Sequence, residues 1–444
     1  MFTRFRSMPA TAMAAVLGCA LMATATPAAA QKREKAKKEE AAKGATISPS
    51  KGFTPALKKM MDATTAKDGA ALQTALTEGQ GVATSNEDKY LLAFYQLQLG
   101  ILNKDQALQG QGLDAMLESG LTPGENARAY NYYSGSFAYN AKDYPKAIKR
   151  LEAAKAAGST EANLSALLMD SYLQGGQIDQ GWAIAKAGID AARAAGAKPS
   201  EELYVRPAQA FQKANRTNEM LDVLTMRVQD YPAPATWRNT LYIMLQQAAG
   251  DKELNLDILR LMRATGSMTE RPEFLEYAAL ATEAGYPGEV VAVIKHGEAK
   301  GVIPKGDARF GPILETQTPR AASDATALAA DATKPATLTN PKAARATADA
   351  LVGNGDYAKA IPLYEAALSA GGAADPVVQY RLGVAQALAG QTDAAVASLA
   401  KVQGNRQRLA QLWTVQAKAK AAPAAPAPAA AAPAAPAAAP ATGG

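Results

Sequence analysis

A pattern of small residues recurs along this chain at the length of a helical hairpin. Gly135 is followed twelve residues later by Ala147, and Gly383 is followed twelve residues later by Ala395. Where neighbouring units can be compared, the period is 34 or 35 residues, as it is between Ala147 and Gly181. A fixed period of this length is typical of stacked helical hairpins, which form α-solenoids rather than globular enzyme cores.

The small and bulky residues are spaced so that the two antiparallel helices of a unit can approach each other. Helices pack closely only where small side chains meet, and residues four and seven positions later continue the same face. In the first clear unit, Leu151 and Ala154 hold these positions after Ala147. We expect the following residues to form the packed crossings of the repeats: Gly135, Ala147, Leu151, Ala154, Gly181, Ala348, Ala360, Tyr364, Ala367, Gly383, Ala395 and Leu399.

Three segments, 131–154, 346–368 and 378–402, resemble the tetratricopeptide repeat family. The second of them has Gly355-Asp356-Tyr357 at its turn, followed by Ala360. The resemblance implies an all-α fold, an α-solenoid of antiparallel helical hairpins in a right-handed superhelix, whose first helices line a concave groove. The alternative is a helical hairpin array of another type, which is also an α-solenoid.

The segment 51–128 fits the period only as helical pairs of uneven length. Ser85 and Asp88 have the spacing of a capping box ahead of a helix that includes Tyr90 and Leu97. We therefore expect helical hairpins here, although without the regular repeat.

The resemblance also indicates which positions face a protein or peptide partner in the groove. These positions are Tyr132, Ser136, Tyr139, Asn163, Asp170, Gln209 and Lys213. The alternative for each of them is an ordinary exposed helix residue. Some family members clamp a peptide carboxylate with Lys and Asn side chains, but the matching positions here are Tyr132, Ala166 and Val205, which do not support that chemistry.

The positive charge of the chain lies at its ends. The formal net charge is +6, yet Arg4 and Arg6 carry +2, residues 31–44 carry +3 and residues 405–444 carry +4, so that residues 45–404 carry −3. A nucleic-acid-binding protein concentrates basic residues on its folded surface. The charge distribution therefore argues against a nucleic-acid partner.

The N-terminus has the features of a secretory signal peptide. Arg4 and Arg6 form a basic region, and an apolar run of small residues follows over 10–26. Ala28-Ala29-Ala30 offers small residues at a cleavage site, so we expect the mature chain to begin at Gln31. No later apolar stretch has the ~18 residues that a transmembrane helix needs. The expected location is periplasmic or secreted.

The single cysteine, Cys19, lies inside this signal segment. Val16-Leu17-Gly18-Cys19 resembles a bacterial lipobox, which would make the protein a lipid-anchored envelope-assembly factor. The apolar run continues beyond Cys19 through Leu21, Met22 and Ala23 to the cleavage site, whereas a polar tether is expected after a lipidated cysteine. The cleaved form without a lipid is therefore favoured.

The residue types needed for catalysis are sparse. His296 is the single histidine, which argues against a Ser–His triad or a site of several histidines. Glu118-Ser119-Gly120-Leu121-Thr122-Pro123 resembles the catalytic-glutamate motif of lytic transglycosylases, but no Gly-Leu-Met-Gln segment follows it. We expect no enzymatic activity, no cofactor and no metal; a helical accessory domain of a peptidoglycan-active enzyme is the remote alternative.

Shifts in composition divide the chain into six segments. Pro304, Pro312, Pro319 and Pro335 interrupt the repeat pattern, which predicts a linker with one short helix near 322–330. The expected segments are a signal peptide (1–30), a charged disordered lead-in (31–50), a repeat domain (51–300), the linker (301–342), a repeat pair with a capping helix (343–417) and a disordered Ala/Pro-rich tail (418–444). The function that follows is an exported scaffold for protein–protein interaction in the bacterial cell envelope.

Overall fold

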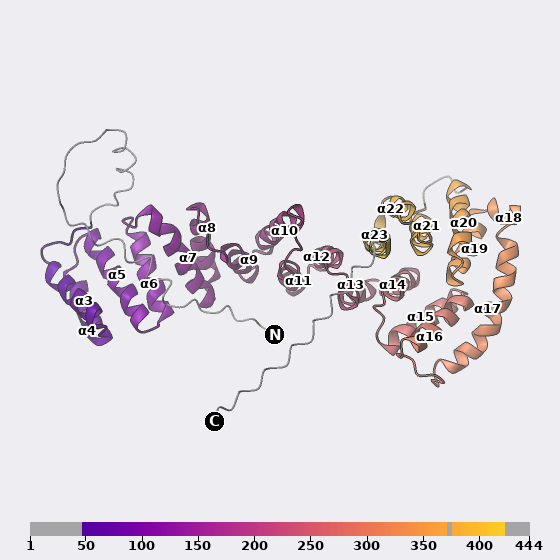
Figure 1. The fold of residues 1–444 in the computed structure, drawn as a ribbon, viewed down its shortest axis with the longest axis horizontal. Coiled ribbons are helices and arrows are strands. Elements are labelled where there is room, and N and C mark those ends of the chain that lie inside the picture. Colours follow the sequence, from indigo (N-terminus) through magenta and orange to yellow (C-terminus); the bar gives the residue numbers. More distant parts are fainter. Residues whose placement is uncertain (1–46, 371–374, 422–444) are drawn as a thin grey trace, which may run out of the picture. The chain divides into compact units, whose positions relative to one another are not determined.

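The computed structural model describes residues 47–370 and 375–421, and the regular structure in these ranges is helical (Figure 1). The predicted all-α fold of sequential antiparallel hairpins is thereby confirmed. The signal segment with Cys19, most of the charged lead-in and nearly all of the Ala/Pro-rich tail lie outside the described residues. Within the described ranges, no helix combines the length and the apolar character required to span a membrane.

The chain divides into two compact units, residues 1–217 and 218–444. The helices of unit 1 are α3 (Thr54–Ala66), α4 (Gly69–Val82), α5 (Asn86–Leu102), α6 (Gln106–Glu118), α7 (Gly124–Asn140), α8 (Tyr144–Ala156), α9 (Leu164–Gln174), α10 (Ile178–Ala194) and α11 (Glu202–Lys213). They form the hairpins α3–α4, α5–α6, α7–α8 and α9–α10, and each hairpin packs on the next.

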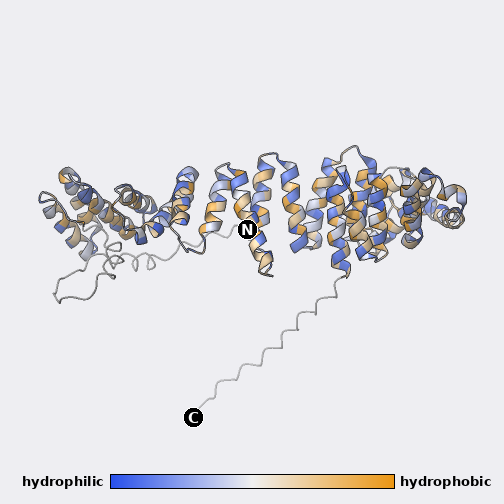
Figure 2. Cartoon of the chain, turned by 90° about the horizontal axis from the view of Figure 1, so that it is seen from above, coloured by the Kyte–Doolittle hydropathy of each residue, from blue (hydrophilic) through white to orange (hydrophobic). Residues whose placement is uncertain are grey.

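Unit 2 begins with α12 (Thr217–Asp230), whose first residue lies at the boundary. Its other helices are α13 (Pro234–Gln247), α14 (Lys252–Ala264), α15 (Arg271–Glu283), α16 (Pro287–Ala299), α17 (Gly311–Asp331), α18 (Pro335–Leu338), α19 (Pro341–Gly353), α20 (Tyr357–Ala370), α21 (Pro376–Leu388), α22 (Thr392–Leu399), the 3-10 turn η1 (Gly404–Arg406) and α23 (Gln407–Ala421). Figure 2 shows hydrophilic and hydrophobic residues mixed along the helices of the chain.

Glycine and alanine stand where the helices of a hairpin cross most closely. A Cβ atom added to Gly135 would lie 2.7 Å from Leu151 Cγ, and one added to Gly383 would lie 2.6 Å from Leu399 Cγ. The facing alanine, Ala147, is fully buried. The structure therefore places these predicted crossing residues at steric contacts that leave no room for a larger side chain.

The region without a regular repeat has a close crossing of the same kind. A Cβ atom on Gly112 in α6 would lie 2.7 Å from Leu97 N and 2.8 Å from Ala93 O in α5. On the other side of this crossing, a Cβ atom on Gly100 would lie 2.7 Å from Gln109 N. The α5–α6 hairpin thus also has small residues where its two helices come closest.

Several hairpin turns of unit 1 share one design. A lysine with positive φ ends the first helix, as at Lys104 (φ 57°) and Lys142 (φ 62°). The next residue is an aspartate that caps the second helix, and Asp105 and Asp143 accept hydrogen bonds from backbone N–H groups of α6 and α8. The left-handed residue stops one helix and the aspartate starts the other, which keeps the connection short.

The structure differs from the expected linker over 301–342. α17 spans 21 residues from Gly311 to Asp331 and packs against α16 and α19. Pro312, Pro335 and Pro341 lie in the first turns of α17, α18 and α19. Proline is tolerated in a first turn because its missing N–H group would have no intrahelical partner there. These prolines mark helix starts, and the predicted helix near 322–330 is the second half of α17.

The last repeats belong to the compact core of unit 2. Trp237 and Leu241 of α13 share one hydrophobic cluster with Tyr380 of α21 and Trp413 of α23. The indole Nε1–H of Trp413 donates a hydrogen bond to Tyr380 Oη at 2.9 Å, and α19 packs against α16. The segment 343–417 therefore packs on the preceding helices of unit 2. The boundary between the compact units lies between residues 217 and 218, not in the expected linker over 301–342.

Candidate functional site

A pocket of about 830 Å³ opens on unit 1, and side chains of α7, α9 and α11 contribute to it. Tyr139, Asp170, Gln209 and Lys213, four of the seven predicted groove residues, lie in its wall. α7 and α9 are the first helices of the hairpins α7–α8 and α9–α10, and α11 packs on α9 and α10. The pocket therefore forms on the first helices of two neighbouring hairpins and on α11, where the resemblance implies a groove.

An ion pair between a buried carboxylate and a partly exposed arginine lies in the wall of the pocket. Asp170 is 2% exposed, and its Oδ2 atom accepts a hydrogen bond from Tyr139 Oη at 3.1 Å. Arg206 Nη1 forms an ion pair with the same carboxylate, and Arg206 Nε donates to Glu202 Oε2 at 2.7 Å. Burial raises the pKa of Tyr139, which the nearby Arg206 charge opposes in part. The tyrosine is thus a neutral donor to the carboxylate.

The walls of the pocket combine apolar and polar side chains. Leu173, Ile178 and Val205 supply apolar surface, and the exposed Gln209 and Lys213 lie at the α11 side. Such a mixture binds an apolar side chain and fixes its orientation with a few polar contacts.

Three of the predicted groove residues are elsewhere. Tyr132 is 5% exposed and packs in the hydrophobic cluster of Ala147 and Leu164, so the prediction that it faces a ligand is wrong. Ser136 is half-buried on α7, and Asn163 is exposed at the residue that precedes α9. Neither of these two lines the pocket.

Sequence reasoning missed two residues of this site, Glu202 and Arg206. Both line the pocket on the same helix as the predicted Gln209. Arg206 is three residues before Gln209 and four residues after Glu202, which are the spacings of one helix face. The periodicity of α11 could therefore have identified them.

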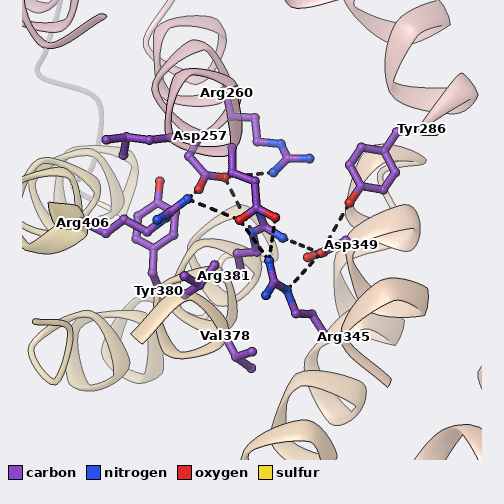
Figure 3. A network of polar contacts seen from close by, with 12 residues as sticks. Asp257, Arg260, Tyr286, Arg345, Asp349, Val378, Tyr380, Arg381 and Arg406 are labelled. Carbon is purple, nitrogen blue, oxygen red and sulfur yellow. Dashed lines mark hydrogen bonds and ion pairs between the residues drawn. The ribbon is translucent and has the colours of Figure 1, made fainter. Parts of the chain in front are cut away.

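A second group of polar residues lies buried in unit 2 and joins segments that are far apart in the chain (Figure 3). Asp257 of α14 accepts hydrogen bonds from Arg260 at 3.0 Å and from Arg406 Nε at 2.9 Å. Arg381 of α21 forms an ion pair with Asp349 of α19. We call the residues Glu253, Asp257, Arg260, Glu289, Arg345, Asp349, Arg381 and Arg406 the charge network.

Two acidic members of the charge network, Asp257 and Glu289, are held in the ionised form. Burial works to raise the pKa of Asp257, but the charges of Arg381, Arg260 and Arg406 outweigh it and lower the pKa. Burial acts in the same way on Glu289, whose pKa is lowered by Arg260 through two hydrogen bonds of 2.8 and 2.7 Å. Buried carboxylates remain charged only where such partners compensate for the lost water.

The residues considered for catalysis have structural partners. Glu118, in the peptide that resembles the transglycosylase motif, ends α6 and accepts a hydrogen bond from Arg150 Nη2 at 2.9 Å. His296 stacks on Phe274 with ring centroids 6.3 Å apart, and burial together with the Arg263 charge lowers its pKa. In the described ranges, no three His, Cys, Asp or Glu residues are grouped so that they could hold a metal ion.

This architecture, sequential helical hairpins with small residues at their crossings, defines a helical-repeat protein. Residues 351–419, from the end of α19 into α23, match the model of the tetratricopeptide repeat family. No curated protein matches the chain.

Three solved structures are among those that the chain matches. The complex of the TPR2AB domain of yeast Sti1 with pHSP90 is 13% identical, covers 66% of this chain and 99% of its own, and has a TM-score of 0.24. The Cut9–Hcn1 hetero-tetramer of the APC/C is 12% identical, with 79% and 86% covered and a TM-score of 0.17. The human IFIT1 dimer with PPP-AAAA is 12% identical, with 80% and 94% covered and a TM-score of 0.19.

Proposed function

We propose that this chain is an exported scaffold that binds a segment of a partner protein in the pocket of unit 1. The observation that carries the proposal is the convergence of Tyr139 from α7, Asp170 from α9 and Gln209 from α11 on one pocket. A volume of about 830 Å³ lies within the range of ~300–1,000 Å³ in which protein pockets bind ligands.

The chemistry of the pocket favours a peptide with an apolar side chain flanked by polar groups. Leu173, Ile178 and Val205 offer apolar surface to that side chain. Gln209 can donate and accept a hydrogen bond, so it suits a peptide backbone, and Lys213 adds one positive charge at the edge. The ion pair of Asp170 with Arg206 keeps this part of the wall rigid and close to neutral.

Selection from a displayed library of random peptides tests this proposal. Peptides enriched on the wild-type protein should lose at least roughly tenfold in affinity for Val205→Glu and for the double variant Gln209→Ala, Lys213→Glu, because both changes alter the pocket wall. Lys149→Glu, which changes an exposed lysine of α8, is the matched control and should bind as the wild type does. Equal binding by all variants would place the peptide site elsewhere.

Export to the periplasm or beyond is the second part of the proposal. It is supported by Arg4, Arg6 and the small residues of 28–30, which have the order of a cleaved signal peptide. The intact mass of the protein isolated from its own cells tests it, and we expect a chain that begins at Gln31. A diacylglyceryl-modified N-terminus at Cys19 would instead support the lipid-anchored envelope-assembly factor.

A further inference from the structure

Three arginines from separate helices of unit 2 meet at one carboxylate. Arg345, Arg381 and Arg406 point toward the same region of the charge network (Figure 3). Arg345 Nη2 donates to Glu253 Oε1 at 3.0 Å, and the distances from Arg381 Nη2 and Arg406 Nη2 to Glu253 Oε2 are 3.6 and 3.8 Å. Glu253 lies in the first turn of α14. One side chain thus faces three positive charges.

Glu253 is the exposed member of this group. Its side chain is 58% exposed, whereas those of Arg381 and Arg406 are 5% and 4% exposed. Arg345 is 26% exposed and connects the buried arginines with the surface. A glutamate side chain with this exposure can rotate into water at little cost, but the buried guanidinium groups cannot follow it.

The carboxylates around the arginines do not satisfy all of their N–H groups. Within the described residues, Arg381 Nε and Arg406 Nη2 are buried without a hydrogen-bond acceptor. The closest carboxylate oxygens to them are Asp257 Oδ1 at 3.7 Å and Glu253 Oε2 at 3.8 Å, which is too far for a hydrogen bond. A buried charged donor without an acceptor is costly, so the group has capacity for another oxygen atom.

The charges of the group also favour an anion. Two buried carboxylates, Asp257 and Asp349, compensate for two of the three arginines. The third positive charge is balanced at the surface by Glu253, with Asp375 Oδ2 more distant at 4.0 Å from Arg345 Nη1. Rotation of Glu253 into water would leave an excess of one positive charge on three arginines, of which Arg381 and Arg406 are buried.

We propose that Arg345, Arg381 and Arg406 form a binding site for an oxyanion, and that Glu253 occupies this site in the free protein. A carboxylate or phosphate group takes the place of Glu253 when Glu253 rotates away. The planar guanidinium group suits both anions because it donates two parallel hydrogen bonds to them. The site belongs to unit 2 and is independent of the peptide pocket in unit 1.

Calorimetric titration of the full-length protein tests the proposal. Inorganic phosphate and a peptide of glutamate residues are titrated into wild type, Glu253→Gln and Glu253→Ala, with sodium chloride added to keep the ionic strength constant. We expect at least one of these anions to bind the two variants roughly tenfold more tightly than the wild type, because the internal competitor is gone. The anion that binds then distinguishes a free phosphate from an acidic side chain of a partner.

Two further variants separate the site from general charge effects. Adding Arg345→Ala to Glu253→Gln should abolish the gain in affinity. Glu283→Ala, which removes an exposed glutamate paired with Lys252, should bind anions as the wild type does. The proposal is overturned if Glu253→Gln retains its helical circular dichroism and binds neither anion, or if Glu283→Ala gains as much affinity as Glu253→Ala.

Discussion

At the scale of single residues, the absence of a side chain sets the distance between helices. Gly135 and Gly383 face Leu151 and Leu399 at distances where even one added carbon atom would overlap. Both leucines are buried, so they cannot move into solvent to make room. The same residue type in open space has no such role, as Gly81 shows, because a Cβ atom there would meet nothing within 4 Å.

Gly135→Ala and Gly81→Ala should therefore have opposite effects on stability. Gly135→Ala is expected to lower the free energy of unfolding by about 1–3 kcal/mol through overpacking against Leu151. Gly81→Ala in α4 should raise it by about 0.5–1 kcal/mol, because alanine loses less backbone entropy in a helix. Urea unfolding followed by circular dichroism measures both. If Gly135→Ala leaves the free energy of unfolding unchanged, the helices at this crossing can move apart to accommodate the added carbon atom.

At the scale of elements, caps and turns decide where each helix begins. The capping box predicted from Ser85 and Asp88 is present at the start of α5. Asp88 does more than cap, because it also accepts hydrogen bonds from Ser50 N and Ser50 Oγ, each at 2.8 Å. It thereby holds the segment before α3 against the start of α5, and the side chain is fully buried.

Asp88→Ala should be more costly than the loss of an ordinary cap. We expect it to lower the free energy of unfolding by about 1.5–3 kcal/mol, because it leaves several partly buried donors without their charged acceptor. Asp68→Ala removes the exposed N-cap of α4 and should lower it by about 0.5–2 kcal/mol. Denaturant midpoints of both variants give the comparison. If both variants lose the same stability, Asp88 contributes no more than an ordinary N-cap.

The last helix should be needed for the stability of unit 2, and the residues after it should not. A chain that ends at Arg406 lacks α23 with the buried Leu409, Leu412 and Trp413, and its thermal transition should fall clearly. A chain that ends at Ala421 lacks the Ala/Pro-rich segment 422–444, whose composition cannot form a core, and its transition should match the wild type. A fall in the second chain would show that this segment packs.

At the scale of the whole molecule, long-range polar contacts join α14 to η1 and α23 at the end of unit 2. Arg406 bonds to Asp257 across 149 residues of chain, and Gln416 Nε2 donates to Ala264 O at 3.1 Å across 152 residues. These contacts accompany the cluster that Trp237 and Trp413 share. Unit 2 is therefore held by contacts beyond those of neighbouring repeats, which alone stabilise a simple solenoid.

Asp257→Asn should strongly weaken the contacts between α14 and the end of unit 2. Removal of one charge from a buried ion-pair network is expected to cost about 3–5 kcal/mol, because Arg381 and Arg406 lose their counter-charge. Since the folded-state pKa of Asp257 is lowered, its contribution is present above the unfolded-state pKa of about 3.9 and disappears as the pH falls through the folded-state value.

Urea unfolding at pH 7 and at stepwise lower pH below about 4 checks this. The wild type should lose more stability on acidification than Asp257→Asn does. Asp331→Asn, which changes an exposed aspartate paired with Lys334, is the matched control and should follow the wild type at each pH. If the free energy of unfolding of the wild type and of Asp257→Asn falls equally with pH, the claim that ionised Asp257 stabilises unit 2 is contradicted.

The sequence predicted the local features well and the distant ones poorly. The period of small residues indicated the hairpins, and four of the seven expected groove residues line one pocket. Tyr132 was misplaced because a tyrosine on a helix face is equally compatible with a groove and a core. The linker over 301–342 was misread because prolines at helix starts and prolines in loops have the same signature in a single sequence.

The sequence by itself determined the all-helical repeat, since periodic small residues leave antiparallel hairpins as the way to bury their apolar faces. It also determined where most turns fall, because glycine, proline and aspartate act on the backbone next to them. Only the tertiary structure decided that Asp257, Arg381 and Arg406 meet. Ion pairs between distant residues have no periodic signal, because they depend on how the packed helices return to one another in space.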